Sequence, residues 1–333
     1  MPTYGKVKTK YFFKGTRMSK EVNAIILAAG KGTRMKSDLL KVLHKVAGKP
    51  VISYVINTVK NCNAKPFLVV GHQKEKLIQE LQNNSLTYVT QEQQLGTGHA
   101  VKQVIPHLNT KTESITLILA GDCPLISEST INHLIKYHSE NNLAATILTT
   151  NMQDPTGYGR IVRNSNNQVE AIKEHKDCDS KERKITEINS GVYAFDTKLL
   201  TKFITEIATN NAQAEYYLTD IIEILKNKDY KVDATVIDNS DEVIGINTRE
   251  DLAKTNSIKY LENTSIHMKN GVTIIDPKTT FIDSDVTIKE DTTIYPFCVI
   301  KGVTKIGKNC TIKSFSDIEN LELADSTIYP VRS

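Results

Sequence analysis

The segment spanning residues 24–41 holds the side chains whose types and spacing best suggest a chemical function. A short apolar run leads into a loop with two glycines, followed by Arg34 and Lys41. Glycines let backbone N–H groups approach an anion, and two cations can hold several phosphates. The loop therefore predicts a site for a nucleoside triphosphate. It lacks the Gly-x4-Gly-Lys-[Ser/Thr] pattern of a Walker loop, and Met35 stands where a dinucleotide fingerprint needs a small residue.

The elements that must position this loop alternate between strands and helices. Strands separated by helices predict an α/β fold with a mostly parallel, Rossmann-like sheet. Ligands bind beyond the carboxyl ends of such strands, so we expect the loops that follow two of them to share one crevice. The expected strands are 24–29, 67–70, 88–90, 115–120, 145–148, 160–162 and 188–195. The expected helices are 51–60, 74–82, 98–105 and 128–141.

The C-terminal part of the chain has a different pattern, with a strict six-residue period. Seven isoleucines follow it, and small or β-branched residues stand four positions after each of the first six. Three such hexads make one coil of a left-handed parallel β-helix, so we expect two to three coils here. The isoleucines are Ile282, Ile288, Ile294, Ile300, Ile306, Ile312 and Ile318.

Composition narrows the classes of protein. The chain has 333 residues, of which 39% are hydrophobic and 24% charged, and its net charge of +4 is too small and dispersed to suggest nucleic acid as a partner. No stretch is long and apolar enough for membrane insertion. The five cysteines form no CxxC pair, which favours reduced thiols and a cytoplasmic location.

Several separate motifs resemble those of the sugar-nucleotide pyrophosphorylases, and among them the bacterial N-acetylglucosamine-1-phosphate uridyltransferases. The resemblance extends from about Val22 to about Ser326. It implies uridylyl transfer from UTP to N-acetylglucosamine 1-phosphate with release of pyrophosphate. The motifs are Leu27-Ala-Ala-Gly-Lys-Gly-Thr-Arg-Met35, Lys41-Val-Leu-His44, Gln94-Leu-Gly-Thr-Gly-His-Ala100, Gly121-Asp-Cys-Pro-Leu125, Asp154-Pro-Thr-Gly-Tyr-Gly-Arg160, Glu174-His-Lys-Asp177, Glu187-Ile-Asn-Ser-Gly191 and Asn211-Ala-Gln-Ala-Glu-Tyr-Tyr-Leu-Thr-Asp220.

The resemblance also implies roles for individual residues. Arg34 and Lys41 would be catalytic, binding pyrophosphate and bridging the reacting phosphates. Asp122 and Asn247 would be ligands of Mg²⁺, the implied cofactor. On local grounds alone, Asp122 could instead be a cap or turn residue, and Asn247 could cap the helix that follows it. The other implied substrate-binding residues are Leu27, Ala28, Ala29, Gly30, Gln91, Gly96, Thr97, Gly159, Glu174, Asn189, Glu215, Tyr217 and Thr219.

Some of these positions have a competing structural interpretation. The segment with Gln91, Gly96 and Thr97 resembles the part of the family that recognises uracil, but it could be a plain strand-to-helix turn. Tyr217 could be a core residue, and His99 is expected to pack rather than transfer protons. Three positions depart from the family pattern, which often has Pro at Leu40, Tyr at Ala120 and Val at Cys123.

The sequence predicts four segments. Residues 1–20 form an N-terminal extension, disordered or a tag; 21–248 form the nucleotidyltransferase domain; 249–265 form a linker helix; and 266–333 form a truncated β-helix. In the family the β-helix continues into an acetyltransferase site and builds a homotrimer, so we expect no acetyl transfer and a weakened trimer here. Two alternatives remain, a sister sugar-1-phosphate nucleotidyltransferase and a non-catalytic regulatory subunit of the same fold.

Overall fold

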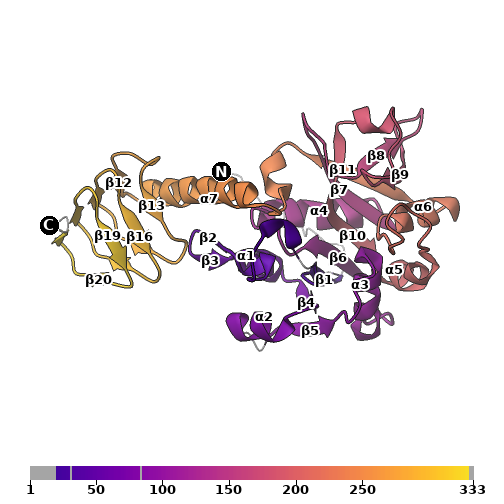
Figure 1. Ribbon diagram of the computed structural model, residues 1–333, viewed down its shortest axis with the longest axis horizontal. Helices are drawn as coiled ribbons and strands as arrows, with labels where there is room; N and C mark the ends of the chain where they lie inside the picture. The colour runs from indigo at the N-terminus through magenta and orange to yellow at the C-terminus, as the bar shows by residue number, and fades with distance from the viewer. Residues whose placement is uncertain (1–19, 31, 83–84, 330–333) are drawn as a thin grey trace, which may run out of the picture.

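The computed structural model describes residues 20–30, 32–82 and 85–329. The predicted N-terminal extension, 1–20, lies outside these residues except for its last position. No helix in the described part of the chain is long and apolar enough to cross a membrane. A large α/β domain and a smaller β-helix lie at opposite ends of the molecule, connected by one long helix (Figure 1).

A nine-stranded sheet forms the centre of the larger domain, in the order β11-β7-β10-β6-β1-β4-β5, with β8 attached to β10 and β9 to β8. The pairs β1–β4, β1–β6, β4–β5 and β7–β11 are parallel, whereas β10 runs antiparallel to β6 and β7. The mostly parallel sheet is therefore confirmed. The strands are β1 (Glu21–Leu27), β4 (Lys65–Val70), β5 (Thr87–Thr90), β6 (Ser114–Ala120), β7 (Ala145–Asn151), β8 (Arg160–Arg163), β9 (Val169–Lys173), β10 (Glu187–Asp196) and β11 (Val232–Ile237).

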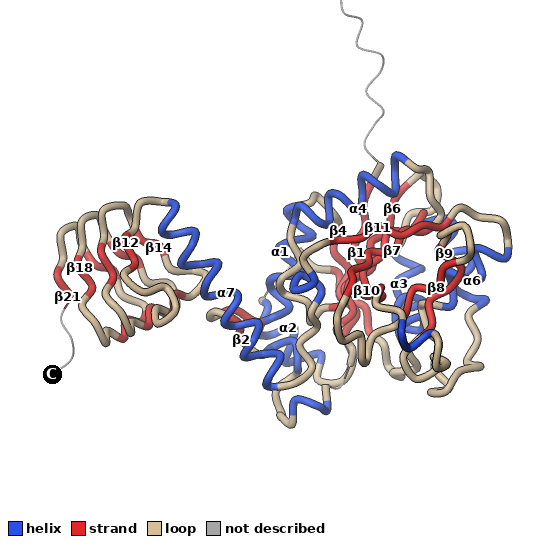
Figure 2. Tube along the Cα trace, turned by 90° about the horizontal axis from the view of Figure 1, so that it is seen from above, coloured by secondary structure: helices blue, strands red, loops and turns tan. Residues whose placement is uncertain are grey.

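Helices cover both faces of this sheet (Figure 2), and a separate apolar cluster lies between the sheet and the helices on each face. Buried residues of α1 recur at helical spacing, which gives one apolar stripe against the sheet. One face carries α1 (Val51–Asn61), α2 (Lys74–Leu81) and α4 (Glu128–Glu140). The other carries α3 (Thr97–Val104), α5 (Thr197–Phe203) and α6 (Asp220–Asn227).

The β-helix follows α7 (Arg249–Lys269), which runs to Lys269 rather than to the predicted end at 265. Its short parallel strands stack into three sheets, as the hexad period predicts. Partners in successive coils are mostly 18 residues apart, for example Val299 opposite Asp317. The sheets are β12 (Thr273–Ile274), β15 (Thr293–Ile294), β18 (Thr311–Ile312) and β21 (Ile328–Tyr329); β13 (Phe281–Ile282), β16 (Val299–Lys301) and β19 (Asp317–Glu319); and β14 (Thr287–Ile288), β17 (Lys305–Ile306) and β20 (Glu322–Leu323).

All seven hexad isoleucines are buried, and so are the small residues four positions after the first six. Beyond Ile318 the period shortens by one, because Leu323 rather than Ala324 packs against the core. Lys305 accordingly faces Glu322, which is 17 rather than 18 residues away. The last coil is the least buried, and Ile328 is 62% exposed.

A hairpin of the larger domain contacts the first coil of the β-helix. It consists of β2 (Lys45–Val46) and β3 (Lys49–Pro50). The Ser284 N–H donates to the Ala47 carbonyl over 3.0 Å, and Lys49 Nζ pairs with Asp285 Oδ1 at 2.5 Å. The two parts are thus joined by side contacts as well as by α7.

Several elements differ from the sequence-based expectation. The strand β1 ends at Leu27, two residues before the predicted end at Ala29. Ala28 and Ala29 therefore belong to the loop. The strands β9 and β11 and the helices α5 and α6 were not expected, and each is at most eight residues long. The helix α6 does have one apolar face, formed by Ile221, Ile222 and Leu225, which the sequence analysis overlooked.

Candidate functional site

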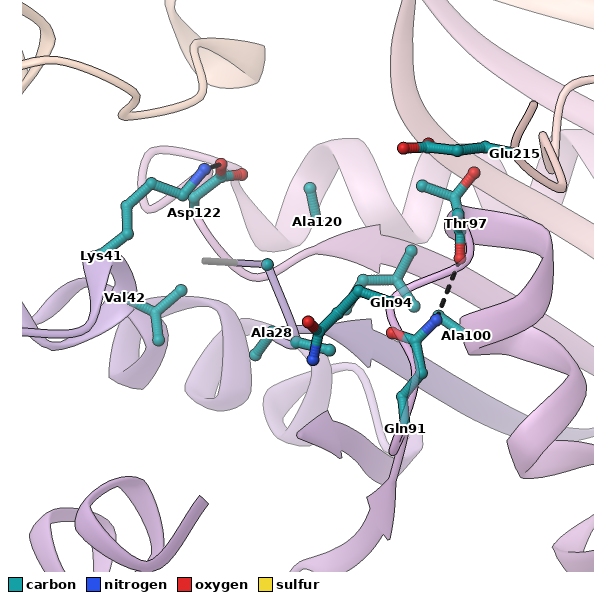
Figure 3. A pocket seen from close by; sticks show the side chains of 14 residues that line it. Ala28, Lys41, Val42, Gln91, Gln94, Thr97, Ala100, Ala120, Asp122 and Glu215 are labelled. Atoms are coloured by element: carbon teal, nitrogen blue, oxygen red, sulfur yellow. Dashed lines mark hydrogen bonds and ion pairs between the residues drawn. The ribbon is translucent and has the colours of Figure 1, made fainter. Parts of the chain in front are cut away.

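A cleft of about 320 Å³ opens where the loops after β1, β5 and β6 meet, at the carboxyl ends of these strands (Figure 3). This is the edge at which a parallel sheet binds ligands. Ten of the predicted site residues line the cleft, so the loops that were expected to share one crevice do share it. They are Leu27, Ala28, Ala29, Gly30, Lys41, Gln91, Gly96, Thr97, Asp122 and Glu215.

Charged and polar groups converge at one end of this cleft. The Lys41 ammonium forms an ion pair with the Asp122 carboxylate and donates to Asn247 Oδ1 over 3.1 Å. Arg34 Nη2 donates to the same Asn247 oxygen over 2.8 Å. Two cations and two oxygen ligands from three distant segments therefore meet, as Figure 3 shows for Lys41 and Asp122.

Local structure holds Lys41 in this place. Lys41 begins a short 3-10 helix, Lys41–Leu43, and Gly32 packs against its side chain. Gly32 has a φ of +62°, and a Cβ added there would lie 2.6 Å from Lys41 Cβ. Only glycine combines this backbone conformation with so close an approach. Gly32 is a positioning residue that the sequence analysis did not single out.

Asn247 is not the cap of α7, the alternative that the sequence left open. Thr248 is the N-cap, and it forms a capping box with Asp251. The Asn247 side chain instead accepts hydrogen bonds from Arg34 and Lys41. Because Asn and Thr are both good caps, the sequence alone could not choose between adjacent positions.

The residues at this end of the cleft suit a hard divalent cation. Asp122 Oδ2 and Asn247 Oδ1 both face the Lys41 ammonium, so they lie close enough to share one cationic partner. Among the described residues, no group of three His, Cys, Asp or Glu side chains could hold a metal by itself. One carboxylate with one amide oxygen fits Mg²⁺, which takes most of its ligands from water and phosphates.

The loop that precedes α3 forms the opposite end of the cleft. Gly96 has a φ of +111°, and a Cβ there would lie 2.6 Å from the Tyr216 carbonyl oxygen. The Gly98 N–H donates to that carbonyl over 2.8 Å, and the Leu218 N–H donates to Thr97 Oγ1 over 3.0 Å. The loop is thus held by hydrogen bonds to the segment that carries Glu215.

Five of the implied substrate-binding residues do not line the cleft, namely Gly159, Glu174, Asn189, Tyr217 and Thr219. The Thr219 hydroxyl donates to Glu174 Oε1 over 3.2 Å, and burial raises the pKa of Glu174. Asn189 is buried, and its amide donates to the Tyr193 hydroxyl over 2.6 Å. A Cβ on Gly159 would lie 3.3 Å from Asn189 Cβ, so these two positions are neighbours.

Tyr217 is 8% exposed, in keeping with the core interpretation that the sequence left open. Its hydroxyl has no hydrogen-bond partner among the described residues. Burial, followed by the nearby carboxylates of Asp177, Glu174, Glu215 and Asp220, raises the pKa of Tyr217 to about 12. The phenol is therefore a hydrogen-bond donor at neutral pH.

The cleft also contains residues that the sequence analysis did not assign. Gln94 lines it, and a Cβ on Gly71 would lie 2.8 Å from Gln94 Nε2. The signal was present, because Gln94 begins one of the motifs. Ala120 lines the cleft where the family often has Tyr. Cys123 is buried, and burial raises the pKa of its thiol well above the usual value, so it is a small apolar neighbour of Asp122.

Two protein-family models match the chain. The model described as nucleotidyl transferase matches residues 23–245, which include the cleft. The model described as bacterial transferase hexapeptide (six repeats) matches residues 285–318, inside the β-helix.

The chain is similar to several curated proteins named bifunctional protein GlmU. It is 48% identical to that of Geobacillus thermodenitrificans over 91% of this chain and 66% of the relative. It is 46% identical to that of Listeria welshimeri over 89% of this chain and 65% of the relative. The chain thus spans slightly less than two thirds of these relatives. A solved structure described as a glucose-1-phosphate thymidylyltransferase from Bacillus anthracis has the same fold, with a TM-score of 0.59 at 20% identity, over 71% of this chain and 94% of that chain.

Proposed function

Because the chain belongs to the nucleotidyl transferase family, we propose that it transfers a uridylyl group from UTP to N-acetylglucosamine 1-phosphate and releases pyrophosphate. The observation that carries the proposal is the convergence of Arg34 and Lys41 on Asp122 and Asn247 at one end of the cleft. The similarity to bifunctional GlmU proteins supports the choice of uridylyl transfer.

In this reaction an oxygen of the sugar phosphate attacks the α-phosphorus of UTP. The bond from that phosphorus to the bridging oxygen breaks in line, and its electron pair leaves with pyrophosphate. Both reactants are anions, so neutralising and aligning them supplies most of the catalysis. We propose that Lys41 bridges the two reacting phosphates and that Arg34 holds the departing pyrophosphate.

The proposed cofactor is Mg²⁺, held by Asp122 and Asn247 together with phosphate oxygens. When bound, it would withdraw charge from the phosphates. In the structure the Lys41 ammonium and the Arg34 guanidinium contact the oxygens of Asp122 and Asn247, and so hold these two side chains close together.

The test is pyrophosphate release from UTP with N-acetylglucosamine 1-phosphate, with and without Mg²⁺. Lys41→Ala should abolish release. Lys301→Ala is the control, because Lys301 likewise forms ion pairs, with Asp317 at 2.9 Å and Glu319 at 3.4 Å, but lies in the β-helix. Release with glucose 1-phosphate or another nucleotide, and not with this pair, would instead identify a sister nucleotidyltransferase. No release with any pair would favour a regulatory subunit.

We further propose that the β-helix assembles a homotrimer. The β-helix exposes several large apolar side chains, including Phe297 at 53% and Phe315 at 66%, whose rings stack with centroids 5.2 Å apart. Monomers seldom leave such side chains together in water. Sedimentation velocity of the wild type and of Phe315→Asn tests this, since a trimer that dissociates in the variant supports it and a wild-type monomer at assay concentration contradicts it.

A further inference from the structure

The amide of Gln91 has a fixed orientation in the cleft. Gln91 follows β5 directly and is 3% exposed. Its Nε2 donates to the Gly96 carbonyl over 3.1 Å and lies 3.0 Å from His99 Nδ1. Turning the amide over would place its oxygen against the Gly96 carbonyl oxygen and lose that bond. In Figure 3 the amide oxygen lies on the side of Gln94 and Ala28, away from the dashed bond.

His99 must accept at Nδ1 for this arrangement to hold. A neutral imidazole has one nitrogen that accepts and one that donates. If Nδ1 carried the proton, the Nδ1–H of His99 would point at an N–H of the Gln91 amide. Because Gln91 is buried, its amide could not turn away towards water. If Nε2 carries it, the conflict moves to Gln103 Nε2, 3.2 Å away. Gln103 is only half-buried, so its amide can rotate towards water at a much lower cost.

The position of the His99 ring is set by the loop itself. His99 lies in the first turn of α3, and its ring packs against Tyr216 with centroids 6.2 Å apart. The Tyr216 N–H donates to the Leu95 carbonyl over 2.8 Å, and its carbonyl accepts from Gly98. The imidazole therefore has a fixed place from which Nδ1 reaches Gln91.

We propose that His99 is the positioning residue that turns the acceptor oxygen of Gln91 into the cleft, and that this orientation selects uracil over cytosine. The proposal rests on the uridylyl transfer proposed above. Uracil carries an N–H at ring position 3, whereas cytosine has a lone pair there. The Gln91 Oε1 acceptor can therefore accept a hydrogen bond from the N3–H of uracil. With cytosine, the same oxygen would face the lone pair on N3, and the two acceptors would repel each other. A site built to hydrogen-bond a substrate N–H discriminates strongly against an analogue that lacks it.

The test compares kcat/KM for UTP and CTP in three variants. His99→Leu removes one of the two acceptors that orient the Gln91 amide and leaves only the Gly96 carbonyl. The turned-over amide should then be more populated, and the UTP:CTP ratio should fall about tenfold or more. His99→Asn presents a side-chain oxygen near the place of Nδ1 and should restore the ratio. Gln103→Leu is the control, since it removes the partner on the other side of the ring and should leave the ratio unchanged.

The ratio distinguishes positioning from a general structural role. Damage to the loop would lower kcat/KM for both nucleotides alike, so an unchanged ratio in His99→Leu would overturn the proposal. Binding of UTP and CTP by calorimetry gives the same comparison without turnover. If the wild type binds neither nucleotide, the proposed function fails. If it prefers UTP and His99→Leu keeps that preference, only the role of His99 fails.

Discussion

In the nine-stranded domain, strands and helices of unlike sequence pack in apolar clusters on both faces of the sheet. In the β-helix, by contrast, one isoleucine recurs on each side of the coils from Ile282 to Ile318. The first arrangement leaves loops of individual shape at the strand ends, and the cleft is built from those loops. The second has similar bends between its strands, and its described residues form no comparable cleft with converging cations and carboxylates. If the proposed function is right, substitutions in the two regions should have different effects on activity and on stability.

The largest expected effect concerns Asp122. Asp122→Asn keeps an oxygen but removes the charge that faces Lys41, so activity should fall by roughly 10²–10³ with a small change in stability. Steady-state kinetics of pyrophosphate release measure this. Asp317→Asn removes a carboxylate that faces Lys301 in the β-helix and should leave the kinetics unchanged. Equal losses in both variants would contradict the separation of roles.

Substituting a core isoleucine of the β-helix should lower stability and leave activity unchanged, the reverse of the effect expected at Asp122. Ile300 is fully buried, so Ile300→Ala should cost about 2–5 kcal/mol in the free energy of unfolding while turnover by the folded protein is retained. Denaturant unfolding and hydrogen exchange of the coils measure the loss. Ile118→Ala, at an equally buried position of β6, should cost a similar amount and also lower activity. If Ile300→Ala abolished turnover in folded protein, the β-helix would be supporting the cleft.

Acid should unfold the larger domain before the β-helix. Burial lowers the pKa of His138 to about 4, and its Nδ1 lies 2.9 Å from Thr146 Oγ1. The unfolded chain takes up a proton below about pH 6.5 and the folded domain does not, so stability falls as the pH drops from about 6.5 to about 4. The loss attributable to this group is about 3 kcal/mol at most. Residues 272–333 contain no histidine.

Hydrogen exchange at pH 7.5, 6 and 5 resolves the two regions. Amides of the sheet should lose protection first, and His138→Gln should remove most of the difference between pH 6 and pH 5. If the coils opened first, or if His138→Gln behaved like the wild type, another group would control the acid response.

The two regions differ in how much of their structure could be predicted from the sequence. The hexads predicted the three sheets and the buried isoleucines, because a period of six places the same residue type at the same position in every coil. The ten strands make slightly more than three coils, whereas two to three were expected. The loops after β1 and β6 were predicted to meet because parallel strands end at one edge. The choice between Asn247 and Thr248 as cap, the packing of Gly32 and the strands β9 and β11 depend on contacts between distant segments, which one sequence does not display.

The packing of Gly32 against Lys41 offers a finer test of the cleft. Gly32→Ala adds a Cβ 2.6 Å from Lys41 Cβ at a φ of +62°, so the lysine must shift, and kcat/KM should fall about tenfold or more. Gly271→Ala is the control near the β-helix, with a φ of +88° and a Cβ 3.0 Å from Glu290 Cβ. It should cost about 1 kcal/mol in stability and leave the kinetics unchanged. Unaltered kinetics in Gly32→Ala would mean that Lys41 is not held by this contact.

The smallest expected effect concerns Leu40, where the family often has proline. Leu40 has a φ of −52° and a ψ of 135°, which a proline ring permits, and its N–H donates to no described residue. In Leu40→Pro, restricting the unfolded chain should raise the free energy of unfolding by about 0.4–1 kcal/mol. Leu40 is buried in the apolar cluster of the α1 face, so the smaller proline also loses packing there, and the two effects should nearly cancel without a change in kcat. Leu39→Pro is the matched control, because the Leu39 N–H donates to Ser37 Oγ over 3.2 Å and its loss should destabilise the loop. A rise in kcat for Leu40→Pro would show that the flexibility of the chain just before Lys41 limits turnover.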